Sequence, residues 1–369
     1  MTINKRTEIP CCEVQPTSPH TTKIDDDCPT RNVQAAIQTW KPIGDNRWIY
    51  ILKEPTTLTL LCGEHMEHVK VAGRMHLRGD IHLMLCGDPA IGKTHLLKAA
   101  QKLAPRAIYT TGQGSTAAGL TATVYREKGR RHWSLSAGAL VIANNGVCII
   151  DDIQLLKDTD RSALLEQMEH QTISIAKAGI VTTLKSDCTV LAACSPINNI
   201  YDRTKPLSYN VPFKAPLLSR FDVHCVISSS DELILEAAAS VLAQHVAAPG
   251  ASEQHPDLIP LELLQQYIAH AKGLRPKLTA ACHDILTDLY ATLRAYCAHY
   301  LAELLTIRAV ESMIRMSEAC AKIHLSEEVT ESHVKMAAKV FLENFMETQF
   351  FAIRENIRTR YSSILNFSF

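Results

Sequence analysis

The chain has 369 residues, of which 46% are hydrophobic and 21% are charged, and its formal net charge is zero. This length leaves room for two or three domains, and a chain of zero net charge has no overall positive field to attract nucleic acid. No apolar run approaches membrane-spanning length and the first ten residues lack a signal-peptide core, so we expect neither a membrane protein nor a secreted one.

The first 44 residues are polar, with scattered Pro, Thr and Asp, and we expect them to be disordered. The sequence has twelve Cys and no CxxC pair, and many Cys lie in apolar runs, where a reduced Cys behaves as a small hydrophobe. This usage favours a reducing compartment and gives little support for a zinc site. Metal binding by Cys11, Cys12 and Cys28, which lie close together, stays open as an alternative.

Residues 87–94 read GDPAIGKT and fit the phosphate-binding loop of two glycines five apart followed by Lys and Ser or Thr. Gly87 and Gly92 let the backbone turn its amides toward a polyphosphate. Lys93 can reach the outer phosphates, and the Thr94 hydroxyl can ligate Mg²⁺. The sequence therefore predicts a nucleotide site rather than an ordinary Gly-rich turn.

Apolar runs and helical patterns alternate from Ile81 to about Ser230, which predicts a parallel sheet covered by helices. The THLLKAAQKL pattern places the phosphates at a helix N-terminus, and a second helical pattern begins at Asp160, a candidate N-cap. The predicted strands are IHLMLC (81–86), GVCIID (146–151), CTVLAA (188–193) and FDVHCVI (221–227).

Two polar positions beside these strands are candidates for catalysis. Asp151 ends its strand where a nucleotide hydrolase holds the Mg²⁺ shell, and Asp152 follows where it can polarise the attacking water. A solvated Asp–Asp turn is the structural alternative. Arg220 precedes the last strand, where a guanidinium can neutralise a transferring phosphate across a subunit boundary; without more context, an exposed surface Arg is the simpler interpretation.

From about Asp231 the strand signal disappears, and helical stripes over residues 261–271 and 307–321 predict an all-helical second domain. The predicted organisation is a disordered segment (1–44), a nucleotide-binding core (45–230, clear from about 78) and a helical region with a C-terminal helix (231–369).

Several longer motifs follow one another along the chain. They are TTGQGSTAAGLTATVYRE (110–127), WSLSAGALVIANNGVCIIDD (133–152), EQMEHQTISIAKAGIVTTL (166–184), APLLSRFD (215–222), RPKLT (275–279) and residues 306–334. With the phosphate-binding loop, they closely resemble the AAA+ ATPase module of the minichromosome maintenance (MCM) replicative helicases, from about Arg78 to the C-terminal end. Within that family, residues 341–361 and the IRMSEACAKIHL stretch are most similar to subunit two of the eukaryotic complex.

The resemblance implies an α/β fold: an AAA+ P-loop NTPase with a parallel sheet flanked by helices, plus a C-terminal all-helical lid. It implies a subunit of a hetero-hexameric ring in the nucleus, with other MCM subunits as partners and ATP and Mg²⁺ as cofactors. Such a ring acts on single- and double-stranded DNA and unwinds the duplex during the initiation and elongation of DNA replication.

The resemblance also assigns roles to residues. Asp151, with Thr94, holds the magnesium shell. Arg220 matches the arginine finger, which acts on the ATP of the adjacent protomer, and Arg308 matches the lid arginine called sensor two, which in this family also reaches a neighbour's ATP. The residues assigned to nucleotide binding are Gly87, Asp88, Pro89, Ala90, Gly92, Lys93 and Thr94.

Two segments are assigned to DNA. Residues 172–182 match the hairpin that enters the ring channel, with Lys177 near its tip against the DNA backbone, and residues 112–133 match the helix-two insertion, where Arg130 and Arg131 add phosphate contacts. Such contacts are independent of DNA sequence and weaken with salt. From the residues alone, Lys177 is an exposed hairpin lysine and the basic run is a solvated face.

The chain departs from the family at two catalytic positions. The family has Glu where this chain has Asp152, and a displacement of about 1 Å in a catalytic group can cost on the order of 10²-fold in rate. The family's sensor-one motif ends in Asn-Pro, whereas here it is Ser195-Pro196, and losing one oriented polar group typically costs about 10²–10³-fold. We therefore predict a site that binds ATP and hydrolyses it slowly.

The family's N-terminal oligonucleotide-binding barrel and zinc module do not fit into the first 80 residues, and we expect no C-terminal winged helix. Three functions stay open. The leading one is a catalytic helicase subunit; Asp152 and Ser195 favour a non-catalytic, ATP-binding structural or regulatory subunit instead. An AAA+ remodeller that acts on proteins is the third, and the hairpin sequence TISIAKAGI disfavours it.

Overall fold

The structure is a computed structural model that describes residues 78–126, 133–177, 179–227, 261–300, 305–349 and 351–365. Several predictions lie outside the described residues: those for residues 1–44, Cys11, Cys12 and Cys28, the part of the nucleotide-binding core before residue 78, and the basic residues Arg130 and Arg131.

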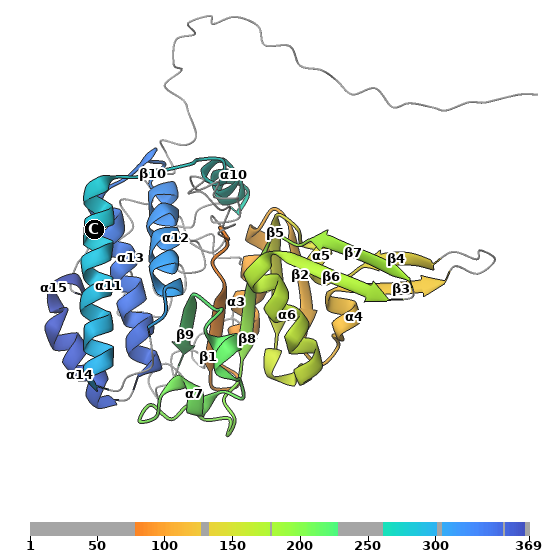
Figure 1. The fold of residues 1–369 in the computed structure, drawn as a ribbon, viewed down its shortest axis with the longest axis horizontal. Helices are drawn as coiled ribbons and strands as arrows, with labels where there is room; N and C mark the ends of the chain where they lie inside the picture. Colours follow the sequence, from red (N-terminus) through yellow and green to blue (C-terminus); the bar gives the residue numbers. More distant parts are fainter. Residues whose placement is uncertain are drawn as a thin grey trace, which may run out of the picture. The chain divides into compact units, whose positions relative to one another are not determined.

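A five-stranded sheet lies at the centre of the core, with the strand order β2-β5-β8-β1-β9 and every neighbouring pair parallel (Figure 1). The predicted α/β fold is confirmed. The strand that sequence patterns did not predict is β2 (Ala107–Thr111), because its side chains are half-buried and form no continuous apolar run. The predicted strands are β1 (Leu83–Gly87), β5 (Gly146–Asp151), β8 (Cys188–Cys194) and β9 (Val223–Ile227).

The central strands are apolar throughout because helices cover both faces of the sheet. Leu83 and Leu85 of β1 join a cluster that includes α3 (Lys93–Leu103) and the lid helices. The alternate residues Met84 and Cys86 point to the other face, which α6 (Asp158–His170) covers. Successive side chains of one strand thus point into two apolar layers, as is typical of a parallel sheet between helices.

The N-cap predicted for α6 is wrong. The helix begins at Asp158, and Lys157 takes the N-cap position without a side-chain hydrogen bond. Asp160 lies inside the first turn, where its Oδ1 accepts a hydrogen bond of 2.9 Å from the amide of Ala117. Its carboxylate therefore joins two elements, a long-range role that the local pattern could not reveal. The short helices of the core are α4 (Ala117–Leu120), α5 (Ala139–Ile142), η1 (Ile153–Leu155), α7 (Leu207–Asn210) and α8 (Ala215–Leu218).

Two antiparallel hairpins extend from the core on the same side in Figure 1. One joins β3 (Ala122–Arg126), which lies in the segment 112–133 matched to the helix-two insertion, to β4 (Trp133–Ala137), which begins at its last residue. The other joins β6 (Thr172–Lys177) to β7 (Ile180–Lys185) and extends three residues beyond the segment 172–182 matched to the channel hairpin. The structure therefore contains an antiparallel hairpin at the position where the resemblance predicts the channel hairpin.

The second region is helical as predicted, apart from one parallel pair of two-residue strands, β10 (Lys277–Leu278) and β11 (Glu328–Val329). Strands this short carry no periodic sequence signal. No helix in the described part of the chain is long and apolar enough to cross a membrane. The helices are α10 (Leu261–Lys272), α11 (Ala280–Tyr300), α12 (Arg308–Ile323), α13 (Glu331–Thr348), α14 (Phe351–Arg360) and α15 (Ser362–Leu365).

The lid helix α13 covers the edge strand β9. The side-chain amide of Asn344 accepts a hydrogen bond of 2.7 Å from the His224 amide and donates one of 3.2 Å to the Asp222 carbonyl. One side chain thus pairs the N–H and C=O groups of an edge strand, which when unpaired can bind a strand of another chain. This contact joins the lid to the sheet at the strand that follows Arg220.

Candidate functional site

The phosphate-binding loop needs both of its glycines. Gly92 has φ of +90°, a left-handed conformation that L side chains rarely adopt, immediately before α3 begins. A Cβ on Gly87 would lie 2.1 Å from the carbonyl oxygen of Ile227, so only glycine fits at the end of β1. Ala90 also has a positive φ of 66°. The loop therefore holds a strained path that ends at a helix N-terminus, where amides point toward an anion.

The ammonium of Lys93 lies over the loop. Its Nζ donates hydrogen bonds to the carbonyls of Gly87 at 2.6 Å and Asp88 at 2.7 Å, and the side chain is largely buried. Burial lowers the pKa of Lys93 from its ordinary value. The loop is anchored from the other side because Asp88 Oδ1 accepts a hydrogen bond of 2.7 Å from the Tyr201 amide.

Two oxygen donors suited to Mg²⁺ face each other beside the loop. The Thr94 hydroxyl donates to Asp151 Oδ2 at 2.8 Å, and the Tyr109 hydroxyl donates to the same oxygen at 2.7 Å. Burial and the neighbouring Asp151 carboxylate raise the pKa of Tyr109 to about 12, so the phenol stays a donor at neutral pH. A hydroxyl and a carboxylate are hard oxygen ligands, and this donor set fits Mg²⁺. Asp151 is buried and hydrogen-bonded, so it is not part of a solvated turn.

The two positions that depart from the family are joined by a third side chain, Gln154. Its Nε2 donates a hydrogen bond of 3.0 Å to Asp152 Oδ1, and its Oε1 accepts one of 3.3 Å from the Ser195 amide. Asp152 itself has a φ of 50° in the left-handed region, a conformation that costs free energy for a residue with a side chain. Sequence patterns gave no signal for Gln154 or Tyr109, since neither belongs to a spaced motif.

The strand register explains why these residues meet. Cys86 of β1 pairs with Cys194 of β8, which places Ser195 beside the loop, and β5 lies next to β8 on its other side. The carboxyl ends of parallel strands share one edge of the sheet, where such folds bind ligands. The predicted residues that gather at this edge are Lys93, Thr94, Asp151, Asp152 and Ser195.

Arg220 and Arg308 lie at the opposite edge of the sheet. Leu83 pairs with Val223 and Gly87 pairs with Ile227, so Arg220, which precedes β9, lies at the amino ends of these strands. Four residues of strand separate the two edges by roughly 13 Å. Arg220 therefore lies away from the phosphate-binding loop of its own chain, and its contacts do not turn it toward that loop.

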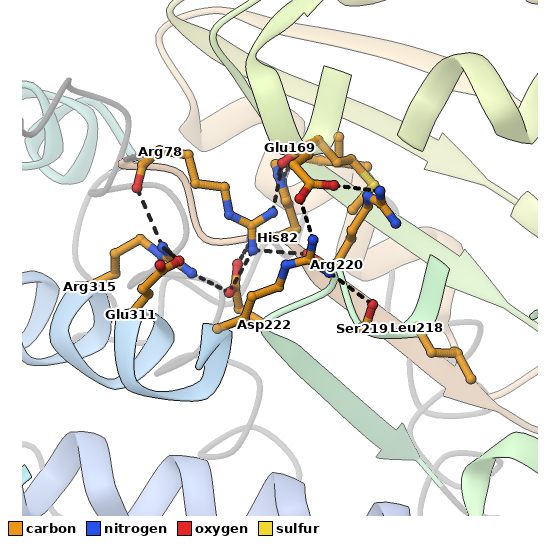
Figure 2. A network of polar contacts seen from close by, with 12 residues as sticks. Arg78, His82, Glu169, Leu218, Ser219, Arg220, Asp222, Glu311 and Arg315 are labelled. Carbon is orange, nitrogen blue, oxygen red and sulfur yellow. Dashed lines mark hydrogen bonds and ion pairs between the residues drawn. The ribbon is translucent and has the colours of Figure 1, made fainter. Parts of the chain in front are cut away.

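Glu169 holds both arginines. Its Oε2 accepts a hydrogen bond of 2.5 Å from Arg220 (Figure 2). Its Oε1 is ion-paired with Arg308. Arg220 also donates to the Pro216 carbonyl at 2.7 Å, and Arg308 donates to the Ser219 hydroxyl at 3.2 Å. Burial raises the pKa of Glu169, but the two guanidiniums outweigh it and hold the pKa below its ordinary value. Arg220 is therefore not a free surface arginine.

A buried charge network lies beside Glu169 and Arg220 (Figure 2). Asp222 Oδ1 accepts hydrogen bonds from Arg78 at 2.9 Å and from Arg315 of the lid helix α12 at 2.7 Å. Burial alone raises the pKa of Asp222, but Arg315 and Arg78 lower it far below its usual range. Arg78 also donates to the Arg220 carbonyl at 3.1 Å. The network fixes the lid, the edge strand and the Arg220 backbone to one another.

The residues assigned to DNA are only partly described. Lys177 is exposed at the end of β6, where it pairs with Ile180, and Gly179 in the turn has a φ of 79°. Its exposure is compatible with a contact to DNA and equally with a solvated surface lysine. In the described ranges, no group of three or more His, Cys, Asp or Glu side chains could hold a metal ion, and the cysteines there are buried and form no disulfide.

Comparison with known proteins gives the family directly. Residues 49–248 match the MCM P-loop domain, and residues 262–345 match the MCM AAA-lid domain. These two matches cover the sheet with its loop and the helical lid described above, and they confirm the predicted fold.

Similar curated proteins carry the name DNA replication licensing factor Mcm2. The chain is 43% identical to the protein from Drosophila melanogaster over 330 residues, which cover 86% of this chain and 37% of that protein. It is 40% identical to the Xenopus laevis protein over 334 residues, with the same coverage, and 38% identical to the Arabidopsis thaliana protein over 317 residues, which cover 80% and 34%. The chain thus spans little more than a third of the length of these relatives.

The predicted similarity to subunit two is confirmed by these names. The family assignment rests on the P-loop match, which alone covers more than half of the chain. The chain belongs to the MCM family and carries its P-loop domain and its AAA-lid domain.

Proposed function

We propose that this chain is an ATP-binding subunit of a replicative DNA helicase ring, in which each nucleotide lies between two protomers. The observation that carries the proposal is the separation of the site's halves. The loop lies at the carboxyl edge of the sheet, and the arginine pair lies at the amino edge. Because the loop and the arginine pair of one chain lie too far apart to meet on one nucleotide, a complete site needs the loop of one protomer and the arginines of its neighbour. The names of the relatives, which describe replication licensing factors, support the replication role.

Within its own site, the chain binds and orients the triphosphate. The loop amides and the α3 N-terminus receive the phosphates, and Lys93 exchanges its carbonyl partners for phosphate oxygens. Thr94 and Asp151 are the residues that would hold Mg²⁺, which supplies charge neutralisation between the outer phosphates when bound. Asp152 is the candidate for orienting the attacking water, and Ser195 is the candidate polar contact to the outer phosphate.

On the other edge, Arg220 and Arg308 act on a neighbour's ATP. A guanidinium that meets the transferring phosphoryl group stabilises charge that develops in the transition state. The channel hairpin with Lys177 contacts the DNA backbone, the Arg130 and Arg131 segment adds further contacts, and the working ring moves along DNA in the nucleus. These DNA roles rest on the family resemblance and on the exposed hairpin.

A second function, a non-catalytic ATP-binding subunit, has its own support. Asp152 is one methylene shorter than the family's Glu, and its carboxylate already accepts a hydrogen bond from Gln154. Ser195 offers a short side chain where the family has an amide. In this alternative, ATP stabilises the ring by binding at the interface, and hydrolysis occurs at the other sites.

The test compares Lys93→Ala with Arg220→Ala in rings reconstituted from this chain and its MCM partner subunits. If the chain is a catalytic subunit, both substitutions lower ring ATPase and unwinding. If it is a non-catalytic subunit, Arg220→Ala lowers ATPase and Lys93→Ala does not. Arg358→Ala, which breaks an exposed pair with Glu355 on α14, is the matched control. Unchanged activity in both Lys93→Ala and Arg220→Ala rings contradicts a place for this chain at the interfaces that hydrolyse ATP.

A further inference from the structure

One carboxylate receives two arginines that come from different parts of the chain. Glu169 is near the end of α6, Arg220 follows α8, and Arg308 is the first residue of the lid helix α12. Each oxygen of Glu169 takes one guanidinium. The sequence separation is 51 residues for Arg220 and 139 for Arg308, so the meeting is produced by the fold and not by a local pattern.

The pairing keeps two like charges together. Two guanidiniums repel each other, and a shared carboxylate between them offsets that repulsion. Further contacts, to the Pro216 carbonyl and the Ser219 hydroxyl, come from one short segment at α8. The arginines are therefore positioned by four contacts that leave their planes little freedom.

The pair stays open to a ligand. The side chains of Arg220 and Arg308 are 17% and 33% exposed, and both line a cleft of about 650 Å³ between the core and the lid. A guanidinium has five N–H donors, and the hydrogen bonds of Arg220 to the Pro216 carbonyl and to Glu169 use one N–H on each of its two terminal nitrogens. Donors thus remain for an incoming phosphate while the Glu169 contacts persist.

We propose that Glu169 is a positioning residue that sets Arg220 and Arg308 for one phosphate of the adjoining protomer's nucleotide. The inference rests on the proposed function, since it assumes that the two arginines act on a neighbour's ATP. Glu169 acts through the arginines and does not itself touch the nucleotide. Its loss leaves two repelling guanidiniums without a common anchor, and misplacing a catalytic group by about 1 Å can cost on the order of 10²-fold in rate.

The first experiment tests the anchor in the free chain. Phenylglyoxal modifies arginines, and peptide mapping reports the modification rate of Arg220 and Arg308 separately. Glu169→Gln keeps the shape and removes the charge, so it should raise both rates several-fold. Glu355→Gln, which removes an exposed carboxylate that also pairs with an arginine, should leave both rates unchanged. Equal rates in the parent chain and in Glu169→Gln overturn the inference.

The second experiment tests the consequence in reconstituted rings. Glu169→Gln should lower kcat for ATP by about 10-fold and change KM by less than about twofold, because positioning acts on the transition state. In an Arg220→Ala background the same substitution should have little further effect. A normal or raised kcat in Glu169→Gln rings overturns the inference, provided that Arg220→Ala lowers kcat. No effect of Arg220→Ala or Arg308→Ala overturns the proposed function instead, so the two failures are distinguishable. A thermal unfolding curve close to that of the parent chain establishes that Glu169→Gln is folded.

Discussion

The two edges of the central sheet hold their charged side chains in different ways. At the carboxyl edge, Lys93 is held by loop carbonyls, and Asp152 is held by the neutral amide of Gln154. At the amino edge, Asp222 is held by two buried arginines and Glu169 by two partly buried ones. The first set of contacts is neutral and exchangeable, whereas the second consists of ion pairs that join the core to the lid.

The difference between the two edges matches two tasks, the binding of a nucleotide at the carboxyl edge and the positioning of arginines at the amino edge. A loop that must accept and release a nucleotide cannot bury its lysine against a carboxylate, because that charge would compete with phosphate. An arginine that serves a neighbour must keep its place while its own chain has no ligand to hold it, and fixed ion pairs provide that. Substitutions at the two edges test this contrast, and we take them in decreasing order of the change that we expect.

The largest effect is expected at the amino edge, from Asp222→Asn. This change leaves Arg78 and Arg315 buried without their shared carboxylate, and removing one partner of a buried ion pair typically costs about 3–5 kcal/mol. The free energy of unfolding, from urea titration, is the measurement. Asp158→Asn, which weakens the ion pairs of an exposed carboxylate at the start of α6, should change it by less than about 1 kcal/mol. Similar losses from both variants would mean that the network does not stabilise the core–lid contact.

The same edge should give the chain an acid sensitivity. Burial, together with the positive charge of Arg78, lowers the pKa of His82 to about 3, and its Nδ1 accepts a hydrogen bond of 3.0 Å from the Val190 amide. Because the unfolded chain binds this proton near pH 6.5, stability is complete above that pH and falls as the pH drops toward 3. The contribution is about 1.4 kcal/mol per pH unit, or about 2 kcal/mol between pH 6.5 and 5.

His82→Gln tests this sensitivity, since an amide can accept the hydrogen bond from the Val190 amide, can donate to the Met168 carbonyl that His82 Nε2 meets at 3.3 Å, and does not titrate. The free energy of unfolding of this variant should fall less steeply than that of the parent chain between pH 6.5 and 5. The buried carboxyl of Glu318 opposes the slope, because burial raises its pKa to about 7 and its stabilising effect is lost as the pH rises through that value. Parallel pH profiles for parent and variant would show that His82 is not a buried neutral histidine.

A smaller effect is expected at the carboxyl edge, from restoring the family's residues. Asp152→Glu combined with Ser195→Asn should raise ATP turnover at this chain's own site by at least about 10-fold, because both groups position the same water. The affinity for ATP should change by less than about threefold, since Lys93 and the loop are untouched. Turnover that rises only slightly would argue that the two substitutions do not limit hydrolysis. Single-site turnover in rings whose other sites carry an inactivating lysine substitution gives the measurement.

The smallest effect is expected from the hairpin, which belongs to neither edge. Lys177→Ala should weaken binding to single-stranded DNA several-fold. It should also reduce the slope of the logarithm of affinity against the logarithm of salt concentration by about 1, the value expected for one lost phosphate contact. Lys185→Ala, at the base of the same hairpin where β7 pairs with Thr172, is the matched control and should have a smaller effect. DNA binding that does not change in Lys177→Ala would favour the remodeller that acts on proteins.

The features that sequence patterns predicted are those built from contiguous residues or from continuous burial. The strands β1, β5, β8 and β9 were found because each is an apolar run, and half-buried β2 was missed because it is not. The same limit explains the wrong N-cap at Asp160, whose carboxylate turned out to serve Ala117. Local patterns carry no information on a partner that lies far along the chain.

The phosphate-binding loop can be predicted from the amino-acid sequence, because its amides, its glycines and Lys93 are neighbours in the chain and their geometry is set by local backbone conformation. The side chains that surround the loop are brought there by the fold. These contacts join distant elements. They are the hydrogen bond from Tyr109 to Asp151, the hydrogen bonds of Gln154 with Asp152 and Ser195, and the ion pairs of Glu169 with two arginines. Parallel strand order placed the loop and the arginines at opposite edges of one sheet. That separation depends on strand register, a property that no spacing of residues along the chain specifies.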